Sequence, residues 1–160
     1  MARSTGNQIE PAIRPLFAGD DLAAREGLTF LLLSTTEDGW PHLAMLSVGE
    51  VLAVDDRRLK LALWRNSTAA GNLTRTERAT LALVHGGAGY YLRLSTRRGP
   101  DVQAPLSGRL AYFVGTVEDM IADEAPYAIL TSGVTFRPKD PADVVPRWEE
   151  LIEALRAAPL

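Results

Sequence analysis

The sequence predicts a mostly β fold: a small antiparallel β-barrel with short helices and a C-terminal amphipathic helix. Six apolar segments of strand length follow one another between residues 28 and 115. Glycine-containing turns separate several of them, as at residues 37–39 and 86–89. One helix-like stretch, residues 65–79, interrupts the series. Short strands joined by hairpin turns, with few helices, are typical of a barrel.

Each predicted strand combines apolar content with a length that is too short for a confident helix. The clearest alternation lies in RLKLALW, where Leu59, Leu61 and Leu63 occupy every second position. VLAV (51–54) is expected to continue the second strand past Gly49. The six predicted strands cover residues 28–36, 40–48, 58–64, 80–85, 90–96 and 106–115.

Two short helices are expected, one between the third and fourth strands and one after the sixth. Ser67 is a suitable N-cap for a helix from Thr68 to Arg75. Thr116 is expected to cap another over Val117–Asp123. Both would be minor additions to the barrel.

The chain length predicts one domain. We expect residues 1–18 to form a tail with a short helix and residues 19–160 to form the barrel domain, with its C-terminal helix at about 144–157. Pro146 suits the first turn of that helix. Its apolar stripe has helical spacing and consists of Trp148, Leu151, Ile152 and Leu155.

The composition argues against several classes of function. A net charge of −3 provides no positive field for nucleic acid, and the basic pairs Arg57–Arg58 and Arg97–Arg98 are expected in solvated turns. The absence of cysteine and the presence of only two histidines argue against a metal site. No apolar run has the length of a membrane span or a secretory signal. We therefore expect a cytoplasmic protein without membrane or nucleic-acid partners.

The segment WRNST (64–68) has the composition of an anion site. A helix N-terminus exposes unpaired backbone amides and a partial positive charge. Ser67 and Thr68 add hydroxyl groups there, and Arg65 precedes them. Taken by itself, the pattern is explained more simply by Ser67 capping a helix.

The order of segments over residues 20–118 resembles the pyridoxamine 5′-phosphate oxidase-like, FMN-binding split-barrel superfamily. The resemblance rests on FLLLSTTEDGWPHLAMLS followed by LKLALWRNSTAAGNLTRTERATLALV. These contain a strand ending in Ser-Thr, a turn with Gly-x-Pro-His, and a segment similar to the family's Ser-x-Lys-x-x-Asn-Leu. The resemblance implies a six-stranded antiparallel split β-barrel and a homodimer whose cofactor site lies where the subunits meet.

The resemblance also implies which residues bind the cofactor. The backbone of the second strand would line the isoalloxazine ring at Met45, Leu46 and Ser47. The end of the third strand and the helix start would approach the ribityl phosphate with Trp64, Arg65, Asn66, Ser67 and Thr68. Asn72 matches the motif asparagine and would tie the helix to its neighbouring loop.

The chain departs from the motif at one position, where Ala69 replaces the lysine. That lysine would supply a cation to the phosphate, and here only Arg65 or the more distant Arg75 could replace it. The missing lysine weakens the case for FMN, which the resemblance still makes the first expected cofactor. A deazaflavin coenzyme, haem or no cofactor at all are the alternatives.

The resemblance implies an FMN-dependent oxidoreductase that acts on a small-molecule substrate, with NAD(P)H as a candidate reductant. The sequence identifies neither the substrate nor a catalytic residue. The alternative function is a non-enzymatic dimeric module that binds flavin, deazaflavin or haem, or a barrel that has lost its cofactor.

Overall fold

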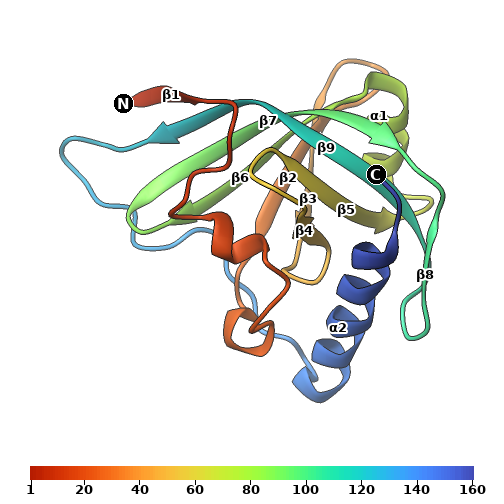
Figure 1. Cartoon of the computed structure of the whole chain (residues 1–160). Coiled ribbons are helices and arrows are strands. Elements are labelled where there is room, and N and C mark those ends of the chain that lie inside the picture. Colours follow the sequence, from red (N-terminus) through yellow and green to blue (C-terminus); the bar gives the residue numbers. More distant parts are fainter.

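The chain folds around one curled antiparallel sheet, seen in Figure 1. A computed structural model describes residues 1–160. Seven strands are neighbours in the order β3-β2-β6-β7-β9-β5-β4, and β1 and β8 add to β9. The strands are β1 (Ala2–Gly6), β2 (Phe30–Thr35), β3 (Pro41–Leu46), β4 (Val51–Ala53), β5 (Arg58–Trp64), β6 (Arg78–His85), β7 (Ala88–Arg98), β8 (Val102–Ala104) and β9 (Gly108–Asp123). The helices are α1 (Thr68–Thr76), α2 (Pro141–Ala157) and the 3₁₀ turns η1 (Arg14–Phe17) and η2 (Ala23–Arg25).

The predicted mostly β split-barrel fold is confirmed, and all six predicted strands are present. Three short strands raise the number to nine. VLAV does not continue the second strand, because β4 pairs with β5 instead. Gly39, with φ of 89°, makes the predicted turn between β2 and β3.

The helix predicted over Val117–Asp123 is wrong, because this segment is the second half of β9. β9 pairs with β7 along this length, and β1 pairs with its far end. Val117, Met120 and Ala122 are buried there. Cross-strand pairing and burial outweigh the local helical preference of the acidic segment.

The N-terminal residues are part of the fold and not a loose tail. β1 pairs with the end of β9. Ile9, Ile13 and Phe17 are buried in the main core, and the Phe17 ring stacks on Phe30 with centroids 4.8 Å apart. Figure 1 shows this segment crossing the sheet in red and orange before β2 begins.

Helix α2 covers the outside of the sheet and contacts β8, β4 and β5. Its buried stripe is the predicted one: Trp148, Leu151, Ile152 and Leu155. The helix begins at Pro141, three residues earlier than expected, with Asp140 as N-cap. Pro146 consequently lies inside the helix and not in its first turn. None of the helices is both long and apolar enough to cross a bilayer.

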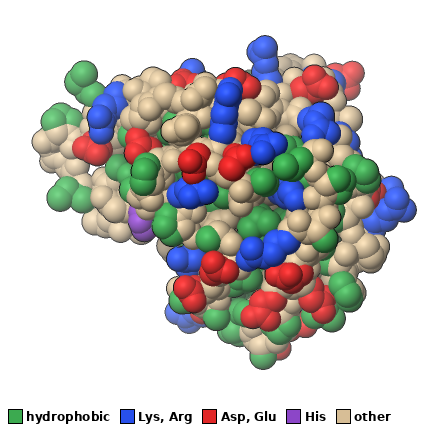
Figure 2. Space-filling view, viewed as in Figure 1, with side chains coloured by type: hydrophobic (Ala, Val, Ile, Leu, Met, Phe, Trp, Pro, Cys, Tyr) green, Lys and Arg blue, Asp and Glu red, His purple; other side chains and the backbone are tan.

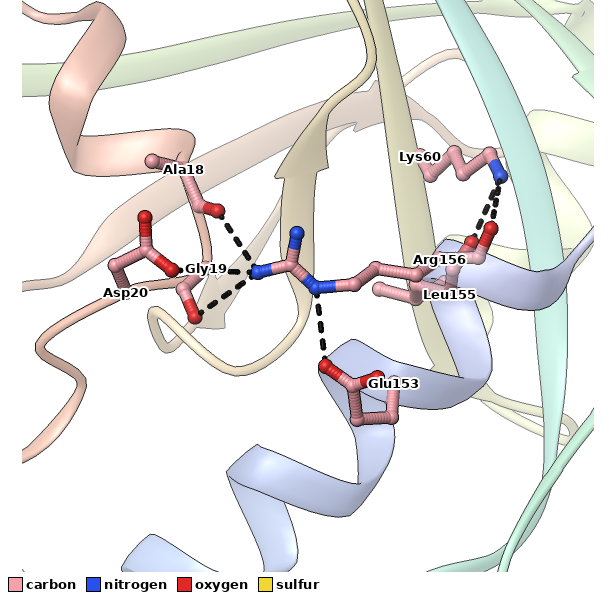
Figure 3. Close-up of polar contacts among 7 residues, drawn as sticks. All are labelled: Ala18, Gly19, Asp20, Lys60, Glu153, Leu155 and Arg156. Atoms are coloured by element: carbon pink, nitrogen blue, oxygen red, sulfur yellow. Dashed lines mark hydrogen bonds and ion pairs between the residues drawn. The ribbon is translucent and has the colours of Figure 1, made fainter.

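A buried lysine holds the C-terminal end of α2. The Lys60 side chain on β5 is only 5% exposed, and its Nζ donates to the carbonyls of Leu155 (2.8 Å), Arg156 (3.4 Å) and Ala158 (2.5 Å). Figure 3 shows two of these bonds, with the Arg156 guanidinium reaching the carbonyls of Ala18 and Gly19. The Lys60 ammonium complements the negative end of the helix dipole. Strand β5, helix α2 and the N-terminal segment are thereby joined.

Candidate functional site

The residues predicted to line the flavin ring lie at the end of β3, where their side chains diverge. Met45 points outward and is 61% exposed, whereas Leu46 and Ser47 are buried. The Ser47 amide and hydroxyl both donate to Glu50 Oε2, at 2.6 and 2.8 Å. Only Met45 among these side chains is therefore open to a large ligand.

Met45 belongs to an outward-facing apolar row across the sheet. It lies opposite Leu31 on β2, and Leu31 lies opposite Ala82 on β6. Ala82 lies opposite Tyr91 on β7, whose hydroxyl donates to Asp123. Because side chains alternate across a strand, these residues share one face of the sheet.

The residues predicted at the phosphate end lie together around the start of α1. Trp64 is 62% exposed, and Arg65, Asn66 and Thr68 are also exposed. Ser67 is the N-cap, and its Oγ accepts from the amide of Ala70 at 3.1 Å. The amides of Thr68 and Ala69 form no hydrogen bond within the chain. An open pair of amides at a helix N-terminus is suited to an anion.

The position of the missing motif lysine faces the protein interior. The Ala69 side chain is 2% exposed and belongs to the main core. A lysine there would place its stem in the core, so a cation for the anion site must come from another position. Arg75 does not supply it, because it lies near the C-terminal end of α1, about 10 Å along the helix from Thr68, and binds the Thr35 carbonyl.

Three arginines converge on one carboxylate beside this helix. Asp101, whose side chain is 7% exposed, pairs with Arg65 Nε (2.8 Å), Arg109 Nε (3.2 Å) and Arg98. Three positive charges against one negative charge leave the cluster at +2. Arg98 also lies over the Phe113 ring, 5.1 Å from its centroid. Arg98 is exposed, as the sequence suggested, but it ends strand β7 and is ion-paired, and does not lie in a turn.

Sequence reasoning identified Arg65 and missed Arg98 and Arg109. They come from β7 and β9, and the pairing of Trp64 with Leu110 brings Arg109 close to the end of β5. The only signal in the sequence was the polar segment RRGPD ahead of the last strand. A positive cluster built from two strands and the turn that follows a third cannot be read from local spacing.

Asn72 is buried and faces the barrel. Its Nδ2 donates to Ser34 Oγ at 3.0 Å, and its Oδ1 accepts from Arg75 at 3.4 Å. The asparagine therefore joins α1 to strand β2, where the sequence suggested a neighbouring loop. Its position fixes the helix against the sheet.

A cavity of about 610 Å³ opens on the outer side of β2, β6 and β7. Its walls include Ser34, Arg78, Arg93 and Glu118. Arg93 pairs with Asp119, and Glu118 accepts from Ser95 and pairs with Arg57. Figure 2 shows acidic and basic side chains interspersed over the visible face, with no broad area of one charge.

Comparison with known proteins gives one close relative in sequence. The chain is 34% identical over 150 residues to the uncharacterized protein YclD of Bacillus subtilis, covering 94% of this chain and 97% of that protein. No family model matches the chain.

Two solved structures share the architecture. A Lactobacillus delbrueckii protein named "putative pyridoxamine 5′-phosphate oxidase" superposes with a TM-score of 0.59 at 13% identity, over 75% of this chain and 98% of its own. HupZ of Group A Streptococcus superposes with a TM-score of 0.54 at 13% identity, over 81% and 99%. These likenesses confirm the fold that the motifs predicted. The chain belongs to one family with YclD and has the split-barrel fold of the pyridoxamine 5′-phosphate oxidase-like superfamily.

Proposed function

We propose that two copies of this chain bind FMN where they meet, and that the protein is a flavin-dependent oxidoreductase for a small molecule. The observation that carries the proposal is the open start of α1: the free amides of Thr68 and Ala69 closely follow Arg65, which joins Arg98 and Arg109 around Asp101. A dianionic phosphate matches both the net charge of this cluster and the helix dipole.

The residues present fit the rest of the cofactor as well. The exposed side chains of Met45 and Trp64 offer apolar surface for a planar ring. The outward row through Leu31 and Ala82 would be covered by the second copy, which also keeps water from the ring. Bound FMN supplies the electron transfer itself, with NAD(P)H as the proposed reductant.

Within this site, the residues of the chain would bind the cofactor phosphate and hold its binding groups in position. Ser67 holds the first turn of α1 in place by accepting from Ala70. Asp101 keeps three guanidinium groups together and in fixed directions. Asn72 holds the helix against β2. These contacts arrange the amides and cations before the ligand arrives, which lowers the entropic cost of binding.

Titration with FMN and with riboflavin, followed by flavin fluorescence, tests the phosphate site. FMN should bind more tightly than riboflavin, since only FMN carries the phosphate. Arg65→Gln should weaken FMN binding about tenfold or more and leave riboflavin binding unchanged. Arg137→Gln, at an exposed arginine without an ion pair, is the matched control. Equal binding of FMN and riboflavin, or no flavin binding, would refute the proposal.

The molecular mass of the protein in solution tests whether it forms the proposed dimer. Light scattering should give twice the 17.4 kDa of the chain. Met45→Asp should shift the mass toward the monomer, because it places a charge in the apolar row. A monomeric wild type would contradict a shared site.

A binding module without turnover is the second candidate. The residues proposed to contact the cofactor include no histidine, cysteine or carboxylate that could act as a general acid or base. Anaerobic addition of NAD(P)H to the FMN-loaded protein distinguishes the two functions. Bleaching of the flavin absorbance supports the oxidoreductase, and a stable oxidised spectrum supports the module.

A further inference from the structure

A second pocket lies at the end of β3. It has a volume of about 360 Å³ and is bounded by β3, the segment around residues 134–136 and helix α2. Phe136 and Trp148 meet there edge to face, with ring centroids 6.2 Å apart and an interplanar angle of 85°. The apolar walls are Met45, Leu46, Val134, Phe136, Val144 and Trp148.

Two polar side chains in this pocket have unused hydrogen-bonding capacity. The Glu50 carboxylate accepts both of its hydrogen bonds, from the Ser47 amide and hydroxyl, at Oε2. Glu50 Oε1 accepts none and is not among the fully buried atoms, so it remains accessible from the pocket, and the carboxylate forms no ion pair. Thr29 Oγ1 is buried without a partner. Both residues line the same pocket.

The unpaired Glu50 carboxylate lowers the stability of the folded protein while the pocket is empty. The half-buried Glu50 carboxylate among apolar walls loses part of its hydration, and no cation pairs with it. Burial accordingly raises the pKa of the Glu50 carboxyl above its ordinary value of 4.5. The two donors of Ser47 oppose this by stabilising the ionised form.

A protonated amine would complete this set of contacts. An ammonium group donates up to three hydrogen bonds and carries the missing positive charge. Glu50 Oε1 can accept one of them, while the rings of Phe136 and Trp148 contact an apolar body. A metal ion is a poorer match, because the pocket offers a single carboxylate among mainly apolar walls.

We propose that this pocket binds a small ligand with an apolar, ring-sized body and a protonated amine that pairs with Glu50. The proposal does not depend on flavin binding, because the pocket is formed entirely by residues of one chain. It adjoins the proposed ring site at Met45, which contributes to both. An amine held here would therefore lie beside the flavin if both are present.

Isothermal titration calorimetry without flavin tests the proposal, with benzylamine as the cationic probe and benzyl alcohol as its neutral counterpart. Benzylamine should bind the wild type, and benzyl alcohol should bind at least tenfold more weakly. Glu50→Gln, which keeps the size and an acceptor oxygen, should weaken benzylamine binding at least tenfold. Glu149→Gln, at an exposed position on the same helix as Trp148, should leave it unchanged.

A second variant separates loss of binding from loss of folding. Val144→Phe fills the pocket from α2 without touching the carboxylate and should also abolish benzylamine binding. Circular dichroism verifies that both variants remain folded. Equal affinity of benzylamine for wild type and Glu50→Gln, equal affinity of the two probes, or no benzylamine binding at all would overturn the proposal.

Discussion

Replacing Lys60 by methionine tests how α2 is attached to the barrel. Methionine preserves most of the length and apolar stem of the lysine but removes the ammonium group. The carbonyls of Leu155, Arg156 and Ala158 would then lose their shared donor. Because Lys60 is 5% exposed, water cannot fully replace the ammonium. The variant should therefore unfold more easily.

The two shorter bonds, at 2.8 and 2.5 Å, dominate the expected loss. Hydrogen bonds to a charged group contribute about 1.5–3 kcal/mol each, and a cation at a helix C-terminus adds about 0.3–1 kcal/mol. Burial lowers the pKa of Lys60 and so offsets part of this gain. We expect a net loss of about 2–4 kcal/mol in the free energy of unfolding, or about 5–15 °C in Tm for a domain of this size.

Urea denaturation followed by circular dichroism measures the free energy, and amide hydrogen exchange locates the change. Exchange should accelerate first in the last turns of α2, since their anchor is removed. Lys139→Met, at an exposed lysine, is the matched control and should change stability little. A Lys60→Met protein within about 0.5 kcal/mol of wild type would refute the role assigned to the buried ammonium, because such a change is typical of a surface substitution.

Three further predictions follow from single contacts. Asn72→Ala should cost about 1–3 kcal/mol, because it removes a buried hydrogen bond between α1 and β2. Gly49→Ala should destabilise the protein by about 1–3 kcal/mol, because the added Cβ would lie 2.4 Å from the ring of Trp148. Gly71→Ala should stabilise the protein by about 0.5–1 kcal/mol, because this position in α1 faces open space and alanine favours the helix. Relative to Glu50→Gln, wild type should lose stability as pH rises above the ordinary carboxyl pKa of 4.5, because a carboxyl with a raised folded-state pKa binds more protons folded than unfolded.

Urea titrations measure all three predictions, the last at several pH values. An Asn72→Ala protein as stable as wild type would show that the bond to Ser34 contributes nothing. The two glycine variants control for each other, so a shift of the same sign in both would contradict the packing argument. A stability difference between wild type and Glu50→Gln that does not vary with pH would show that the carboxyl titrates normally.

The central strands could be predicted because their signals are local. Alternating leucines in β5 and the glycine turn before β3 depend only on neighbouring residues. β1 and β8 were missed because short or polar segments such as ARSTG and VQA form strands only by pairing with β9. The second half of β9 was mistaken for a helix for the same reason.

The sequence by itself determined a small antiparallel barrel, the amphipathic helix over the sheet and the helix start at Ser67, while the split-barrel type came from the resemblance of its motif order to a known superfamily. The barrel, the amphipathic helix and the helix start have local causes. Each follows from the periodicity or capping preference of a few adjacent residues. Only the tertiary structure decided that Ala69 faces the core, that Arg98 and Arg109 join Arg65 at Asp101, and that Glu50 lies unpaired in an apolar pocket. Charge and burial at these positions depend on which strands lie side by side, and strand pairing joins residues that are far apart in the chain.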